Sequence, residues 1–68
     1  MRVAEFQDLS DGHYFDVSVT MDGEIAVLDE DAQLFGPMDD DSTVHPVLAL
    51  FSDGTEAVFK GIFDRKAV

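Results

Sequence analysis

Apolar and polar residues alternate most clearly between positions 15 and 21. Four apolar residues, from Phe15 to Met21, are separated there by Asp16, Ser18 and Thr20. A period of two is typical of a strand with one buried face. No segment carries a sustained 3.6-residue apolar repeat, which an amphipathic helix would need. The pattern therefore predicts strands as the main elements of this chain.

A first hairpin is predicted where Asp22-Gly23 interrupts the alternation. Apolar residues resume at Ile25 and Val27 with the same spacing of two. A three-residue loop over 21–23 would set Val19 opposite Ile25 and Val17 opposite Val27, so that all four share one face of the sheet. A two-residue loop that sets Val19 opposite residue 26 would mix the faces. We therefore predict the three-residue loop, with its glycine in the left-handed conformation.

A second hairpin is predicted around Ser52-Asp53-Gly54, with strands over 47–51 and 55–63. Val47–Phe51 has no polar alternation, which predicts cover on both faces, either in the middle of a sheet or at an oligomer contact. Gly61 marks an expected bulge or bend in the exit strand. The residues assigned to one face of that strand are Ala57, Phe59 and Phe63, and those assigned to the other are Val58, Lys60 and Ile62.

The remaining segments complete a small all-β domain. Arg2–Gln7 fits a strand or a short helix, and Ala32–Phe35 fits a short strand or turn inside an exposed excursion over 31–41, where Gly36-Pro37 excludes a long helix. The fold class expected is all-β: a small antiparallel sheet or barrel of four to six strands built from two hairpins, in a single domain spanning 1–68. A core of this size is marginal, so a homodimer would help to stabilise it.

The charge is large and unevenly distributed. Fifteen acidic residues stand against four basic ones, which gives a net charge of −11 at pH 7. Residues 1–41 hold twelve of the acids and one base, Arg2, whereas residues 42–68 are neutral overall. Such a chain is not suited to bind nucleic acid directly, because its charge has the same sign as the phosphates.

The sequence offers little for catalysis or for a metal. It contains no cysteine and two histidines, His13 and His45, which we interpret as ordinary structural or surface residues. Asp29, Asp31 and Gln33 follow the spacing of a calcium loop, but the sixth position is a leucine and the twelfth is an aspartate, where that loop needs glycine and glutamate. We predict no enzymatic activity, no cofactor and no metal site.

No targeting or membrane segment is recognisable in the sequence. The start lacks a basic region followed by an apolar run, and the longest apolar run, Val47–Phe51, is far shorter than the ~20 residues that span a bilayer. We therefore expect a cytoplasmic protein without a membrane partner.

The density of the negative charge approaches that of nucleic acid. A compact domain of this length has an expected diameter of roughly 28 Å, over which duplex DNA carries about 16 phosphate charges. A net charge of −11 is about two-thirds of that number. Alternate residues of a strand are about 6.6 Å apart, a spacing comparable to that of neighbouring phosphates. A rigid acidic scaffold of this kind could enter a groove lined with Lys and Arg.

The small size, the charge of −11 and the clusters Asp29-Glu30-Asp31 and Asp39-Asp40-Asp41 resemble the small acidic inhibitors that phages and mobile elements encode against host defence. Anti-restriction DNA mimics and several anti-CRISPR proteins belong to that class. The resemblance is one of size and charge and includes no motif. It implies a stoichiometric inhibitor without turnover, acting in the cytoplasm of a host cell on a basic nucleic-acid-binding protein, either a subunit of a defence complex or a nuclease.

Two other functions fit the same features. The first is an acidic interaction module, such as an antitoxin or an immunity protein for a basic toxin. The second is a small structural domain adapted to high salt. For the inhibitor, each contact carboxylate would pair with a Lys or Arg that normally holds a phosphate, and exposed aromatic residues would act as anchors. The expected contact residues are Asp29, Glu30, Asp31, Asp39, Asp40 and Asp41, with Asp8 and Asp11 as secondary contacts and Tyr14 and Phe35 as anchors.

Overall fold

The chain forms one antiparallel sheet in a computed structural model that describes residues 1–36, 38 and 46–66. Within these residues there are six strands and no helix, so the predicted all-β class is confirmed. The sheet order is β3-β2-β1-β6-β5-β4. The strands are β1 (Arg2–Asp8), β2 (Tyr14–Asp22), β3 (Ile25–Leu28), β4 (Ala32–Leu34), β5 (Leu48–Phe51) and β6 (Glu56–Asp64).

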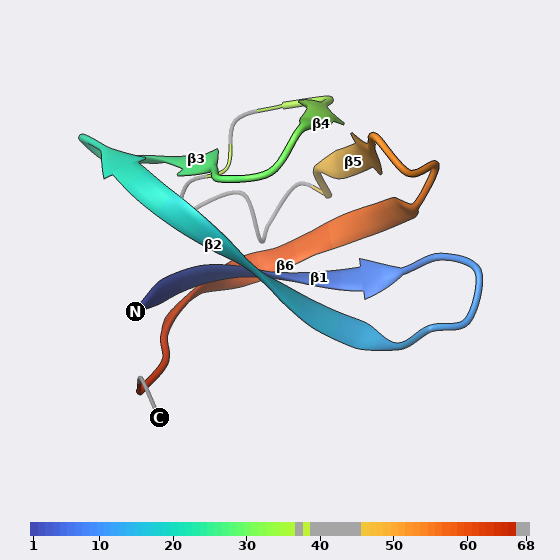
Figure 1. Ribbon diagram of the computed structural model, residues 1–68, viewed down its shortest axis with the longest axis horizontal. Helices are drawn as coiled ribbons and strands as arrows, with labels where there is room; N and C mark the ends of the chain where they lie inside the picture. The colour runs from blue at the N-terminus through green and yellow to red at the C-terminus, as the bar shows by residue number, and fades with distance from the viewer. Residues whose placement is uncertain (37, 39–45, 67–68) are drawn as a thin grey trace.

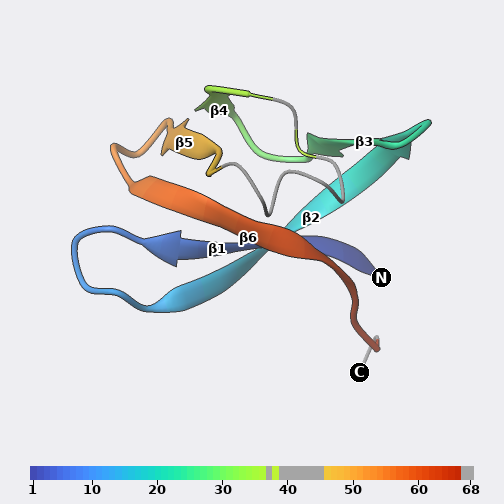
Figure 2. The ribbon, with the colours of Figure 1, turned by 180° about the vertical axis from the view of Figure 1, so that it is seen from behind.

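The sheet curls until its two edges approach each other, as in a barrel that is nearly closed (Figures 1 and 2). The long strands β1, β2 and β6 cross on one side, and the short strands β3, β4 and β5 arch over them. The backbone N–H of Ala26 in β3 donates a hydrogen bond of 2.9 Å to the carbonyl oxygen of Met38, which ties the edge strand to the segment that follows β4. The radius of gyration is 11.1 Å, as expected for a compact domain of this length.

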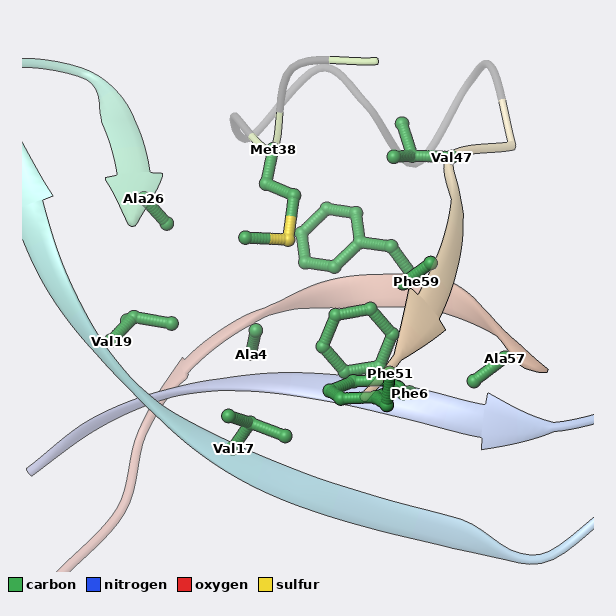
Figure 3. Packing of buried hydrophobic residues seen from close by; sticks show 11 residues of the cluster. Ala4, Phe6, Val17, Val19, Ala26, Met38, Val47, Phe51, Ala57 and Phe59 are labelled. Atoms are coloured by element: carbon green, nitrogen blue, oxygen red, sulfur yellow. The ribbon is translucent and has the colours of Figure 1, made fainter. Parts of the chain in front are cut away.

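Phenylalanine rings fill the middle of the barrel (Figure 3). Phe6 is fully buried, and its ring centroid lies 5.3 Å from that of Phe51, 5.7 Å from that of Phe15 and 5.8 Å from that of Phe59. Aromatic pairs at these distances add stabilisation beyond the burial of their surface. The core therefore depends on one cluster of four rings, contributed by β1, β2, β5 and β6.

The predicted register of the first hairpin is wrong. Asp22 pairs with Ile25 and Val19 pairs with Leu28, so the loop consists of Gly23 and Glu24. Gly23 does have a positive φ of 64°, and a glycine at the first position of a two-residue loop is typical of a hairpin turn that follows the strand twist. Relative to the prediction, every β3 side chain is on the opposite face. Ala26 is buried, whereas Ile25 and Val27 remain 42% and 50% exposed.

The predicted loop of the second hairpin is confirmed. Leu50 pairs with Glu56, and Phe51 and Thr55 face each other across Ser52-Asp53-Gly54 through a hydrogen bond of 2.9 Å from the N–H of Phe51 to the carbonyl oxygen of Thr55. The prediction of cover on both faces of β5 is not met within the described chain. Ala49 and Phe51 are buried, whereas Leu48 and Leu50 are 46% and 36% exposed.

A bulge in β6 is confirmed, but the predicted faces of its last residues are wrong. Glu5 pairs with Gly61 and Phe6 pairs with Phe59, so that Lys60 has no partner residue on β1. Gly61 has φ = 152°, a conformation that favours glycine. The extra residue reverses the alternation, so Ile62 packs against the core and Phe63 is exposed on the outer face.

Candidate functional site

Acidic side chains from three connections gather at one end of the barrel. Because successive strands run in opposite directions, the β1–β2, β3–β4 and β5–β6 connections all lie at the same end (Figure 1). Asp8, Glu30 and Asp53 line a common hollow there, and Glu56 lines a second one with Asp8 and Asp53. We define the acidic end as the carboxylates of Asp8, Asp11, Glu30, Asp31, Asp53 and Glu56.

Backbone hydrogen bonds hold the acidic connections beside one another. The N–H of Ser52 donates to the carbonyl oxygen of Asp31 at 3.2 Å, which joins the β3–β4 connection to the β5–β6 loop. The N–H of Leu9 donates to the carbonyl oxygen of Glu56 at 2.9 Å, which joins the β1–β2 loop to the start of β6. The three acidic segments, far apart in sequence, therefore form one surface.

Two of the acidic turns are fixed by their own carboxylates. An oxygen of Asp8 accepts hydrogen bonds of 2.8 Å from the backbone N–H and 2.7 Å from the hydroxyl of Ser10, and these bonds lower the pKa of Asp8. Asp53 accepts a bond of 2.9 Å from the backbone N–H of Thr55, which likewise lowers the pKa of Asp53. Hydrogen bonds to an ionised carboxylate favour the charged form. Both side chains thus hold their negative charge in a fixed position.

None of the lysine and arginine residues, all of which fall within the described ranges, lies at the acidic end. The four bases of the sequence are Arg2, Lys60, Arg65 and Lys66, and all of them lie on β1 and β6 or just after β6, away from that end. Arg2 begins β1 opposite Asp64, about 20 Å along the strand from Asp8. Among the described residues, therefore, no lysine or arginine pairs with the acidic end, whereas the imidazole of His13 lies 3.6 Å from a carboxylate oxygen of Asp11.

Arg65 neutralises a different pair of acids on the outer face of the sheet. Glu5 and Asp16 sit directly opposite each other on β1 and β2, where like charges would repel. The guanidinium of Arg65 reaches Glu5 at 3.0 Å and Asp16 at 3.2 Å. The hydrogen bond to Asp16, with the charges of both carboxylates, raises the pKa of Arg65. The charges of Glu5 and Asp16 are therefore compensated within the fold by Arg65.

The structure brings only some of the predicted contact residues together. Asp8, Asp11, Glu30 and Asp31 belong to the acidic end, whereas one oxygen of Asp29 accepts a hydrogen bond of 3.1 Å from the hydroxyl of Thr20. The predicted contacts Asp39, Asp40 and Asp41 lie outside the described residues.

The two predicted aromatic anchors are both exposed. Tyr14 is 59% exposed at the start of β2, immediately after the β1–β2 loop, and Phe35 is 57% exposed just after β4. Both rings are therefore accessible to a partner. That these two residues and the described carboxylates act as contacts remains a prediction.

Asp53 and Glu56 were missed, because they lie within residues 42–68, which are neutral overall. A signal for Asp53 was present: the predicted loop at 52–54 joins two antiparallel strands, and such loops alternate between the two ends of a sheet. The chain crosses the sheet once with each strand, so two loops lie at the same end when an even number of strands separates them. Four strands, β2 to β5, separate the β1–β2 loop from the β5–β6 loop.

The other chemical candidates of the sequence are the histidines and a metal site. His13 is exposed, and its Nδ1 lies 3.6 Å from a carboxylate oxygen of Asp11. Among the residues that the structure describes, no group of three or more His, Asp or Glu side chains is arranged to hold a metal ion. The same residues include no helix that could cross a membrane.

Comparison with protein-family models, with curated proteins and with solved structures finds no match for this chain.

Proposed function

We propose that the protein is a non-enzymatic, stoichiometric inhibitor whose acidic end occupies the cationic nucleic-acid-binding site of a protein partner. The partner would be a nuclease or a subunit of a defence complex in the cytoplasm of a host cell, as the resemblance to acidic anti-defence inhibitors suggests. Carboxylates of the acidic end would pair with Lys and Arg side chains that otherwise hold phosphates.

The observation that carries the proposal is the gathering of six carboxylates from three connections and the adjoining strand ends at one end of the barrel, where four of them line two shared hollows. The four lysine and arginine residues, all within the described part of the chain, lie elsewhere. Fixed negative charge of this kind steers a basic partner and raises the association rate, in a way that salt weakens. The turns around Asp8 and Asp53 hold their carboxylates in place before binding, so less side-chain freedom is lost when the complex forms.

The test is a competition assay with matched charge reversals. The tagged protein captures its partner from a candidate host, and the binding of that partner to a labelled duplex or single strand is then measured with increasing amounts of the protein. We expect one-to-one displacement that weakens steeply with salt. The double variant Asp53→Lys/Glu56→Lys should abolish displacement.

The control for that variant is Asp22→Lys/Glu24→Lys, which makes the same charge change at the β2–β3 turn, the opposite end of the sheet (Figure 2). It should retain displacement with at most a modest loss. If the two double variants were equally impaired, net charge and not the acidic end would be responsible, and the proposed site would be wrong.

A salt-adapted structural domain makes a different prediction. Such a domain would unfold in dilute buffer and regain its fold in molar salt, because counterions would be needed to offset repulsion over its whole surface. The gathering of six of the twelve described carboxylates at one end favours the inhibitor instead, and Arg65 already neutralises Glu5 and Asp16. Thermal melts in dilute buffer and in molar salt distinguish the two functions.

A further inference from the structure

Exposed apolar side chains lie in two neighbouring rows across the outer face of β4, β5 and β6, one of which also contains Gln33 and Glu56. Strand register places Phe35 beside Leu48, through a hydrogen bond of 2.9 Å from the N–H of Phe35 to the carbonyl oxygen of Leu48, and Leu48 opposite Val58. In the neighbouring row, Leu50 lies opposite Glu56. The peptide of Leu9 is in turn hydrogen-bonded to that of Glu56. We define the outer apolar patch as Leu9, Phe35, Leu48 and Leu50, all of which are exposed.

The patch is hollowed as well as apolar. Its four members, together with Glu56, line a groove of about 210 Å³. An apolar cavity of about 150 Å³ is large enough for a benzene ring, so this groove has room for one leucine or aromatic side chain. Exposed apolar clusters with a polar rim are typical of protein contact sites. This surface also explains why the sequence of β5 is apolar on both faces.

Charge indicates what covers the groove. Glu56 is the residue common to the groove and to the acidic end, and the ion pairs among the described residues do not include it. Any occupant of the groove removes water from this carboxylate, which is costly unless a cation replaces the water. A second copy of this chain, with its charge of −11, would bring more acid to the same place, and an anionic lipid surface would repel it.

We infer that the outer apolar patch is the anchor pocket for a basic protein partner, taking one large apolar side chain from a segment whose flanking Lys or Arg residues pair with Glu56 and the acidic end. The inference rests on the proposed function in that the partner is basic. It goes further because part of the affinity would come from the apolar anchor buried in the patch, in addition to charge. A nucleic acid, which has no such anchor, would not reproduce this contact.

Three synthetic peptides test the inference on the full chain. The first has tryptophan flanked on each side by three Lys or Arg residues, the second has serine in place of tryptophan, and the third has tryptophan flanked by Asp and Glu. Affinities are measured by fluorescence anisotropy at low salt, and the contact surface by amide shifts of the ¹⁵N-labelled protein. The matched variant is Leu48→Thr/Leu50→Thr, which changes exposed side chains and keeps residues that favour strands.

We expect the basic tryptophan peptide to bind about tenfold more tightly than the basic serine peptide. It should shift the amides of Leu9, Leu48 and Leu50 in addition to those of the acidic end, and the double variant should reduce the tenfold preference to about twofold or less. An unchanged spectrum of β1 and β2, which do not neighbour β5, would show that the fold of the free variant is intact.

The other outcomes each overturn a defined part of the reasoning. Equal binding of both basic peptides, with shifts confined to the acidic end, would refute the anchor pocket and leave the proposed function standing. No binding of either basic peptide would refute the proposed function together with the inference. Equal binding of the acidic tryptophan peptide would refute the requirement for a basic partner. A dimer in sedimentation that Leu48→Thr/Leu50→Thr dissociates would assign the patch to a second copy of the chain.

Discussion

The four-ring cluster should account for a large share of the stability of this protein, and Phe6→Ala tests it. Phe6 is fully buried and lies within 5.8 Å, between ring centroids, of three other phenylalanines. Truncation to alanine removes the ring from its contacts with Phe15, Phe51 and Phe59 at once. The neighbouring rings belong to three different strands, so the cavity can close only if the sheet itself moves.

The expected loss of unfolding free energy is large relative to the total stability of the domain. A buried Phe→Ala change costs about 3–5 kcal/mol of unfolding free energy, and a domain of 68 residues has a total of roughly 3–10 kcal/mol. Phe6→Ala should therefore leave the chain marginally folded or unfolded at 25 °C. Phe6→Leu retains much of the volume and should cost about 1–3 kcal/mol, so a stability difference remains measurable even if the alanine variant does not fold.

Urea unfolding followed by far-ultraviolet circular dichroism measures both changes. The matched control is Phe35→Ala, the same truncation at a ring that is 57% exposed, which should change the unfolding free energy by less than about 1 kcal/mol. The reasoning would be refuted if Phe6→Ala stayed within 1 kcal/mol of the unsubstituted protein, or if Phe35→Ala were as costly as Phe6→Ala.

Three further predictions concern the register, an ion-pair network and a turn. Ala26→Asp should unfold the domain, because it buries an unpaired charge, whereas Val27→Asp on the outer face should be tolerated; thermal melts that rank them in reverse would support the three-residue loop. Arg65→Gln should lower the melting temperature most at low salt, since it leaves two opposed carboxylates without a cation; a deficit independent of salt would contradict this. The pKa of Asp8 in the folded protein lies below its ordinary value of 3.8, so its contribution to stability is fully present above that value and is lost as the pH falls through the folded pKa. Ser10→Ala, which removes one of the two donors, should move that pKa back toward 3.8 in a carbon-13 carboxyl titration, and no movement would show that the hydroxyl contributes nothing.

How far the fold follows from the sequence differs between the two hairpins. Ser52-Asp53-Gly54 separates two strongly apolar strands, and both the loop and the pairing are as predicted. The predicted register of the first hairpin was wrong because it placed the β-branched residues Ile25 and Val27 in the core. The curled sheet instead brings Met38 against β3, where its carbonyl oxygen accepts the N–H of Ala26, and a small side chain takes the inward position. That closure is a tertiary effect, and no local pattern encodes it.

The bulge shows a second limit of the same kind. Gly61 was recognised as a break in the alternation, but an extra residue also reverses the faces of everything that follows. Phe63 consequently lies outside, with the guanidinium carbon of Arg65 4.7 Å from its ring centroid, and Ile62 packs against the core. A period-two pattern predicts faces reliably only as far as the next bulge.

The sequence indicated only part of the candidate site. Charge was summed along the chain, whereas the acidic end combines segments that are far apart in sequence. Asp53 and Glu56 belong to a stretch with no net charge, yet register places them beside Asp8, more than forty residues earlier. The apolar run of β5 gave the complementary signal, since a strand that is apolar on both faces and covered on one leaves exposed apolar surface, which is typical of protein contact sites. The two signals converge at Glu56, where a carboxylate adjoins exposed leucines. A partner that supplied only charge would leave Leu48 and Leu50 in water, and one that supplied only apolar surface would desolvate Glu56 without a cation; a basic segment with an apolar anchor avoids both costs.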